Sequence, residues 1–158
     1  MIALRILDAP LRTTVAPRGI VSFELAKDAD ASRQILDSWN ARAKMHAALS
    51  LGLDYLFLFV YAVFISLACV QVGQTLRHRS PLLARLGEIL AWSQFLAAIL
   101  DAIENAALIS LLFHSERLWW PAVARGCAFI KFTIVGAGLI YIAAGVVMIG
   151  MEKILREK

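Results

Sequence analysis

Three stretches of this sequence are apolar for long enough to cross a lipid bilayer as helices. The hydrocarbon core of a bilayer demands about 20 mostly apolar residues per helix. The stretches lie at about 47–76, 86–113 and 119–151, and each one exceeds that minimum. The sequence therefore predicts an all-α integral membrane helical bundle with three transmembrane helices.

The composition excludes an ordinary soluble protein. Hydrophobic residues make up 60% of the 158 residues and charged residues 18%, against roughly 25% charged residues in a typical soluble domain. A soluble domain of this size exposes about 30% of the surface of its unfolded chain, and this chain has too few polar residues to cover such a surface. The net charge of +4 does not indicate a nucleic-acid partner, because the basic residues form no stripe interleaved with aromatic residues. We assign this charge to membrane topology and lipid headgroups.

The first 46 residues differ from the rest in composition, because they hold seven of the sixteen basic residues and five of the twelve acidic ones. The apolar run 20–26 is too short to cross about 30 Å of hydrocarbon as a helix. It lies on the interface, dips in and returns, or packs against the bundle. Trp39 ends a second apolar stripe and suits an interfacial anchor. We therefore expect an amphipathic N-terminal segment (1–46) packing on or dipping into the membrane, followed by a three-helix transmembrane domain (47–158).

Charged side chains inside the spans need an explanation, since each costs roughly 2.5–3.5 kcal/mol on insertion scales. Because consecutive spans alternate in direction, Asp54, Asp101 and Lys131 lie in the same half of the bilayer, on the side of the N-terminal segment. The sequence therefore predicts a polar pocket open to that side. Its members are expected to be Glu24, Asp54, Tyr61, Asp101, Glu104, Asn105, Arg125 and Lys131.

Helical spacing places these polar residues on defined faces. The face of the first span comprises Ser50, Asp54 and Tyr61, and that of the second comprises Gln94, Asp101, Glu104, Asn105 and Leu108. The face of the third span comprises Lys131, Gly138, Ile142 and Gly145, whose glycines let a neighbouring helix approach closely. The simplest assembly turns all three faces inward.

Three interpretations of this pocket remain open. The carboxylates and cations neutralise one another and hold the helices in register, they bind or transform a ligand, or they form a proton or ion path. Asp101 and Glu104, three residues apart, could share one proton or chelate a hard cation. No His or Cys spacing indicates zinc, so the sequence identifies no metal site, no cofactor and no catalytic residue.

The leading hypothesis for function is a non-enzymatic membrane module that binds a small ligand or a lipid headgroup, or serves as an accessory subunit of a larger membrane complex. A homo-oligomer is also plausible, because three helices bury little against one another. The second hypothesis is an intramembrane lipid-modifying enzyme, with Glu24 or Glu104 as general base or metal ligand and Lys131 or Arg125 steadying an anion. The third is a proton or ion conductor.

Several short motifs follow one another along the chain. They are Pro17-x-Gly19-Ile20-x-Ser22-Phe23-Glu24-x-Ala26, Leu53-Asp54-Tyr55-Leu56-Phe57, Asp101-x-x-Glu104-Asn105 and Ile130-Lys131-Phe132. This series resembles a family of small, uncharacterised bacterial integral membrane proteins. The resemblance implies a multi-pass protein of the bacterial inner membrane and implies no activity.

Overall fold

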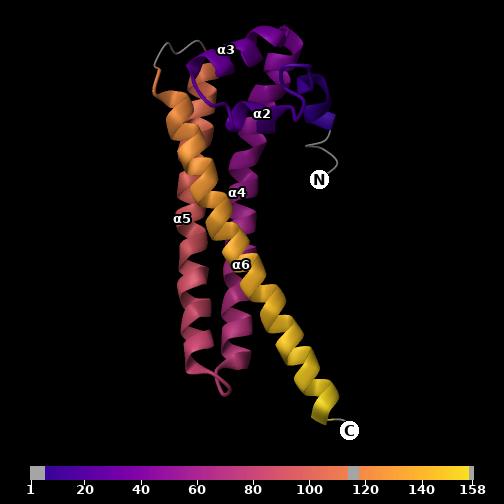
Figure 1. The fold of residues 1–158 in the computed structure, drawn as a ribbon, viewed down its shortest axis with the longest axis vertical. Helices are drawn as coiled ribbons and strands as arrows, with labels where there is room; N and C mark the ends of the chain where they lie inside the picture. Colours follow the sequence, from indigo (N-terminus) through magenta and orange to yellow (C-terminus); the bar gives the residue numbers. More distant parts are fainter. Residues whose placement is uncertain (1–5, 114–117, 157–158) are drawn as a thin grey trace. The chain divides into compact units, whose positions relative to one another are not determined.

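The structure of the protein, a computed structural model, describes residues 6–113 and 118–156, and these residues include no strand. The elements, in chain order, are the short 3₁₀ helix η1 (Ala9–Leu11), α2 (Ile20–Glu24), α3 (Ala29–Ser38), α4 (Ala41–Leu76), α5 (Pro81–Leu112) and α6 (Trp120–Arg156), as Figure 1 shows. Helices α4, α5 and α6 are long and apolar enough to cross a membrane. The predicted fold class is therefore confirmed, and the protein is a multi-pass membrane protein.

Two of the long helices, α4 and α5, begin ahead of the apolar stretches, at positions that suit the first turn of a helix. α4 begins at Ala41, ahead of the expected residue 47, because Oδ1 of Asn40 accepts a hydrogen bond of 2.8 Å from the Ala43 N–H. α5 begins at Pro81, ahead of the expected residue 86, since proline suits the first position of a helix. Hydropathy marks the part of a helix that lipid can surround, whereas caps mark where the helix starts.

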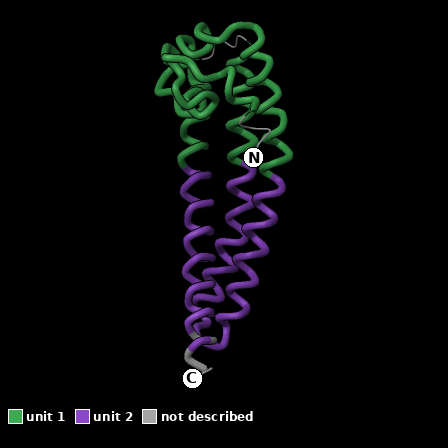
Figure 2. The backbone as a smooth tube through the Cα atoms, turned by 90° about the vertical axis from the view of Figure 1, so that its right-hand side faces the viewer, with its two compact units in different colours: residues 1–58, 100–129 green, residues 59–99, 130–158 purple. Residues whose placement is uncertain are grey.

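The chain forms two compact units, and each unit contains part of all three long helices (Figure 2). Unit 1 comprises Met1–Leu58 and Leu100–Phe129, and unit 2 comprises Phe59–Ile99 and Ile130–Lys158. The N-terminal segment thus belongs to the same unit as the start of α4, the end of α5 and the start of α6. Composition separates residues 1–46 from the apolar stretches, whereas packing joins the described part of the segment ahead of α4 to one part of the long helices.

In unit 1, the N-terminal segment packs against the helices of that unit, and α2 lies across α4 (Figure 1). Phe23 of α2 is buried in an apolar cluster that also contains Leu51 of α4 and Leu108 of α5. The run 20–26 therefore packs against the helices, and its position relative to the membrane stays a prediction.

The Trp39 side chain is buried in the apolar cluster of unit 1. Its expected role as an interfacial anchor is therefore wrong, because the ring is not free to contact lipid headgroups. Its side chain is only 3% exposed, and its ring meets Phe23 edge-on with centroids 5.4 Å apart. Its indole Nε1–H donates a hydrogen bond of 2.8 Å to the carbonyl oxygen of Leu11. A buried indole needs such a partner for its N–H, and here that partner ties η1 to the end of α3.

In unit 2, small residues let the three helices come close together. An added Cβ at Gly87 of α5 would lie 2.8 Å from the carbonyl oxygen of Cys69, and one at Gly138 of α6 would lie 2.8 Å from Nε2 of Gln94. The hydroxyl of Tyr141 on α6 donates a hydrogen bond of 2.9 Å to the carbonyl oxygen of Leu83 on α5. The predicted packing face of the third span is confirmed, because Lys131, Gly138 and Gly145 are buried and Ile142 is partly buried.

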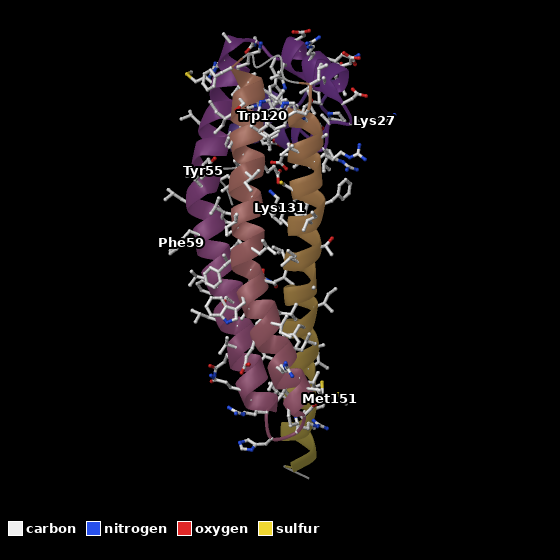
Figure 3. The ribbon with its side chains drawn as sticks, turned by 90° about the vertical axis from the view of Figure 1, so that its left-hand side faces the viewer. Lys27, Tyr55, Phe59, Trp120, Lys131 and Met151 are labelled. Atoms are coloured by element: carbon white, nitrogen blue, oxygen red, sulfur yellow. The ribbon has the colours of Figure 1, made fainter. Side chains whose placement is uncertain are left out.

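Large apolar side chains are exposed along all three long helices. Phe59 and Phe64 on α4, Trp92 on α5 and Ile140 on α6 are each more than half exposed, and Phe59 lies on the outer side of α4 (Figure 3). Exposed apolar surface of this extent promotes aggregation in water, but it suits a helix that is surrounded by acyl chains. The exposed faces therefore agree with a membrane setting.

We expect Trp39→Ala to release the N-terminal segment. Losing the buried ring and its hydrogen bond to Leu11 should cost about 3–5 kcal/mol, and limited proteolysis should then cleave residues 12–27 much faster than in the wild type. Trp92→Ala is the matched control, since Trp92 is 76% exposed. Equal cleavage rates for the wild type and Trp39→Ala would show that Trp39 does not hold the segment in place.

We expect Gly87→Ala to lower the Tm of the detergent-solubilised protein. The added methyl group would overlap the Cys69 carbonyl oxygen and the Tyr141 hydroxyl, and overpacking of this kind costs about 1–3 kcal/mol. Gly150→Ala on α6 is the control, because a Cβ there meets nothing within 4 Å. A Tm for Gly87→Ala at or above that of Gly150→Ala would show that the helices are not in close contact at this point.

Candidate functional site

The structure distributes the eight predicted pocket residues between the two units. Glu24, Asp54, Asp101, Glu104, Asn105 and Arg125 belong to unit 1, whereas Tyr61 and Lys131 belong to unit 2. Tyr61 of α4 is partly buried. Lys131 of α6, labelled in Figure 3, is 6% exposed, and its Nζ lies 5.0 Å from the centroid of the Phe132 ring.

The polar face predicted for the second span is the buried face of α5. Asp101 is 3% exposed, Glu104 0% and Asn105 1%, and Gln94 and Leu108 on the same face are also fully buried. A lipid-facing position would leave these polar groups in hydrocarbon, where they are costly. The helical spacing in the sequence thus correctly identified which side of α5 turns away from lipid.

Asp54 and Asn105 are brought together directly within unit 1. Nδ2 of Asn105 on α5 donates a hydrogen bond of 2.8 Å to Oδ2 of Asp54 on α4. One residue further along α4, the hydroxyl of Tyr55 donates a hydrogen bond of 3.1 Å to the carbonyl oxygen of Ala102. These two contacts fix the register of α4 against α5 and hold the Asp54 carboxylate in a defined orientation.

Arg125 lies on α6 in unit 1. Its guanidinium carbon is 5.7 Å from the centroid of the Phe129 ring, one turn further along the same helix. This spacing fits a cation–π contact. The aromatic ring therefore steadies the charged group without neutralising it.

A pocket of about 460 Å³ lies within unit 1, between the N-terminal segment and α4. Two predicted residues, Glu24 and Asp54, line it. The complete lining is Asp8, Arg12, Pro17, Arg18, Ile20, Val21, Glu24, Ser50, Leu51 and Asp54. Cavities that hold small ligands typically measure about 300–1,000 Å³ and combine an apolar lining with a few polar groups, and this pocket has both properties.

Asp8 organises the wall of the pocket, and sequence reasoning missed it. One of its carboxylate oxygens accepts a hydrogen bond of 2.9 Å from the Ile20 N–H at the start of α2, and the other receives Nε of Arg12 at 2.9 Å. Gly19 makes this approach possible, because a Cβ there would overlap the Asp8 carboxylate and its φ of 57° favours glycine. The four-residue spacing of Asp8 and Arg12 predicts their ion pair, but no local pattern predicts the contact of Asp8 with α2.

The chemistry of this region does not indicate a resident metal. Among the described residues, no group of three or more His, Cys, Asp or Glu side chains is arranged to hold a metal ion. The pocket instead offers carboxylates and guanidinium groups next to aliphatic side chains. Such a lining can bind a molecule that has both a charged group and an apolar body.

A double-mutant cycle on Asn105 and Asp54 tests the link between α5 and the pocket. A hydrogen bond to a charged group contributes about 1.5–3 kcal/mol, so Asn105→Leu and Asp54→Leu should each destabilise the protein and should show a coupling energy of that size. Reversible unfolding in mixed micelles measures it. Additive effects of the two substitutions would mean that this contact does not stabilise the protein.

Comparison of the chain with protein-family models, with curated proteins and with solved structures found no match. The resemblance to small bacterial membrane proteins therefore stays a prediction from the motifs. What is established is a multi-pass helical membrane protein with a pocket beside α4 and a buried polar face on α5.

Proposed function

We propose that this protein is a non-enzymatic membrane module that binds a small amphiphilic molecule in the pocket of unit 1. The observation that carries this proposal is the lining of the pocket, which joins Asp8 and Glu24 of the N-terminal segment to Ser50 and Asp54 of α4. Segments that are far apart in sequence form one concave surface, and its size and mixed polarity are those of a ligand site.

The lining favours binding over catalysis. The ten residues described as lining the pocket include no His, Cys or Lys, which are among the side chains that most often act as nucleophile or general base. Ser50 supplies a hydroxyl, but the only groups among these residues that could serve as its base are the carboxylates of Asp8, Glu24 and Asp54. The carboxylates and guanidinium groups suit recognition of a charged ligand group.

The setting of the protein supports an amphiphilic ligand. The pocket is bounded by α4, which is long and apolar enough to cross a membrane, and by a segment that carries charged side chains. Lipids and other amphiphiles concentrate at this kind of boundary. The resemblance described above supports the bacterial inner membrane as the location, and an accessory role in a larger membrane complex or a homo-oligomer is compatible with this function.

Filling the pocket tests the proposal. We expect the wild type, after incubation with the polar lipid extract of its expression host, to retain a small-molecule adduct in native mass spectrometry. Val21→Trp should lose that adduct, because Val21 lines the pocket and a bulky indole would occupy it.

Val15→Trp is the matched control, since Val15 is an exposed valine of the same segment that is not among the residues lining the pocket. It should keep the adduct. Retention of the adduct by Val21→Trp, or its absence from the wild type, would overturn the proposed function.

A further inference from the structure

We propose that the turn between α4 and α5 binds the headgroups of phospholipids that carry a net negative charge. The surface comprises the end of α4, the turn itself and the first two turns of α5 (Figure 1). We name these residues, 71–88, the turn surface. It belongs to unit 2 and shares no residue with the lining of the pocket in unit 1, so the inference goes beyond the proposed function.

The exposed side chains change in character near the end of α4. Leu67 is 64% exposed, whereas the exposed residues that follow it in this helix are the polar Gln71, Gln74 and Thr75. Polar side chains are costly among acyl chains. The hydrocarbon layer around α4 therefore ends between Leu67 and Gln71.

Close contacts between α4 and α5 fix which residues of the two helices lie at the same height. A Cβ added at Gly73 of α4 would lie 3.2 Å from the carbonyl oxygen of Ala84, and one added at Gly87 of α5 would lie 2.8 Å from that of Cys69. Because the helices are antiparallel, these contacts set the register between them. This register makes two further pairs about level with each other, Gln71 with Arg85 and Leu67 with Ile89.

The exposed side chains of α5 place the edge of the hydrocarbon layer at this same height. Ile89 and Trp92 are 58% and 76% exposed, whereas Arg85 and Glu88, just before them, are exposed charged residues. Tryptophan is common next to the headgroups. A rise of 1.5 Å per residue puts Arg85 about 6 Å beyond Ile89, and the headgroup layer of each leaflet is about 5–7 Å thick. Arg85 therefore lies among the headgroups.

Two guanidinium groups of the turn surface are available to a ligand. The side chains of Arg77 and Arg85 are exposed, and neither forms a hydrogen bond or an ion pair with any residue that the structure describes. Glu88 is the only carboxylate in the sequence of residues 71–88, and it does not pair with Arg85. A guanidinium group carries five N–H donors and binds a phosphate through two of them at once. The charge of these groups thus complements an anionic headgroup.

Exposed leucines beside Arg85 favour a lipid over a soluble anion or an acidic protein. Leu82 is 80% exposed and Leu86 is 42% exposed, and they lie three residues before and one residue after Arg85. Such apolar surface gains contacts from the acyl chains of a phospholipid whose phosphate is held by the guanidinium group. A headgroup with a net negative charge is favoured over phosphatidylcholine, because the choline cation offsets the charge of the phosphate.

Native mass spectrometry of the full-length protein in detergent tests the proposal. The protein is titrated with dioleoyl phosphatidylglycerol or with dioleoyl phosphatidylcholine, and the populations of lipid-bound protein give the affinities. Each basic side chain next to a membrane strengthens the binding of an anionic headgroup about fivefold. We expect phosphatidylglycerol to bind at least about fivefold more tightly than phosphatidylcholine. Equal affinities overturn the proposal.

Removal of either guanidinium group should weaken this preference. Arg77→Gln and Arg85→Gln should each bind phosphatidylglycerol about fivefold more weakly and leave the binding of phosphatidylcholine unchanged. Arg33→Gln is the matched control, because it removes the charge of an exposed arginine on α3 in unit 1. Unchanged binding of phosphatidylglycerol in either turn variant, or an equal loss in Arg33→Gln, overturns the proposal.

Glu88→Gln gives an expected change of opposite sign, which misfolding does not produce. The substitution removes an exposed carboxylate three residues from Arg85. Because the carboxylate repels an anionic headgroup, its loss should strengthen the binding of phosphatidylglycerol, by about fivefold for one unit charge. Unchanged or weaker binding contradicts the assignment of the headgroup to this surface.

A soluble competitor distinguishes a lipid from a free anion. Glycerol 3-phosphate has the phosphate of the headgroup but no acyl chains, so it cannot contact Leu82 and Leu86 as a lipid does. We expect it to leave phosphatidylglycerol bound when the two are present at equal concentration. Complete displacement at equal concentration overturns a membrane lipid as the partner.

Val21→Trp separates this inference from the proposed function. It fills the pocket of unit 1 and should leave the preference for phosphatidylglycerol intact, because Val21 does not belong to the turn surface. Loss of the preference in this variant assigns the anionic lipid to the pocket and overturns the inference. The adduct of the pocket is scored in the Arg77→Gln/Arg85→Gln background, in which binding at the turn surface is weakened.

Discussion

Polar side chains cannot face acyl chains without a large cost, and α5 carries such side chains on one face over much of its length. That face must be covered by protein in each unit. In unit 1, Asn105 meets Asp54 of α4, and in unit 2 Gln94 donates a hydrogen bond of 3.4 Å to the Ile134 carbonyl oxygen of α6. The polar face of α5 therefore sets the side on which the other helices pack, and the positions of the glycines set how closely they approach.

The pocket depends on a second, more local constraint, because it needs a wall that only the N-terminal segment provides. Within that segment, Trp39 ties the end of α3 to η1, and Asp8, next to η1, accepts a hydrogen bond from the Ile20 N–H of α2. Gly19 leaves the space that the Asp8 carboxylate occupies. These contacts hold charged side chains beside α4. The charged lining of the pocket therefore depends on the backbone conformation at Gly19.

Several features of the fold and the site were predictable because they follow from local periodicity. A spacing of 3.6 residues per turn places Asp101, Glu104 and Asn105 on one face, and the structure buries all three. The contact between Asp8 and Ile20, by contrast, depends on a turn whose path no periodic pattern encodes. The frequency of tryptophan at membrane interfaces predicts an interfacial position for Trp39, yet the fold buries its ring and pairs its N–H inside unit 1.

Read by itself, the sequence determined that the chain crosses a membrane as three helices and which face of α5 avoids lipid. Both properties depend on the length of the apolar stretches and on the helical spacing of polar and apolar residues. A single helix has these features whether or not its neighbours are present. Only the tertiary structure decided that the N-terminal segment packs beside α4, that Asn105 orients Asp54, and that Asp8 and Arg12 share a pocket with Glu24. Those contacts join residues distant in sequence, so they exist only once the segments have packed.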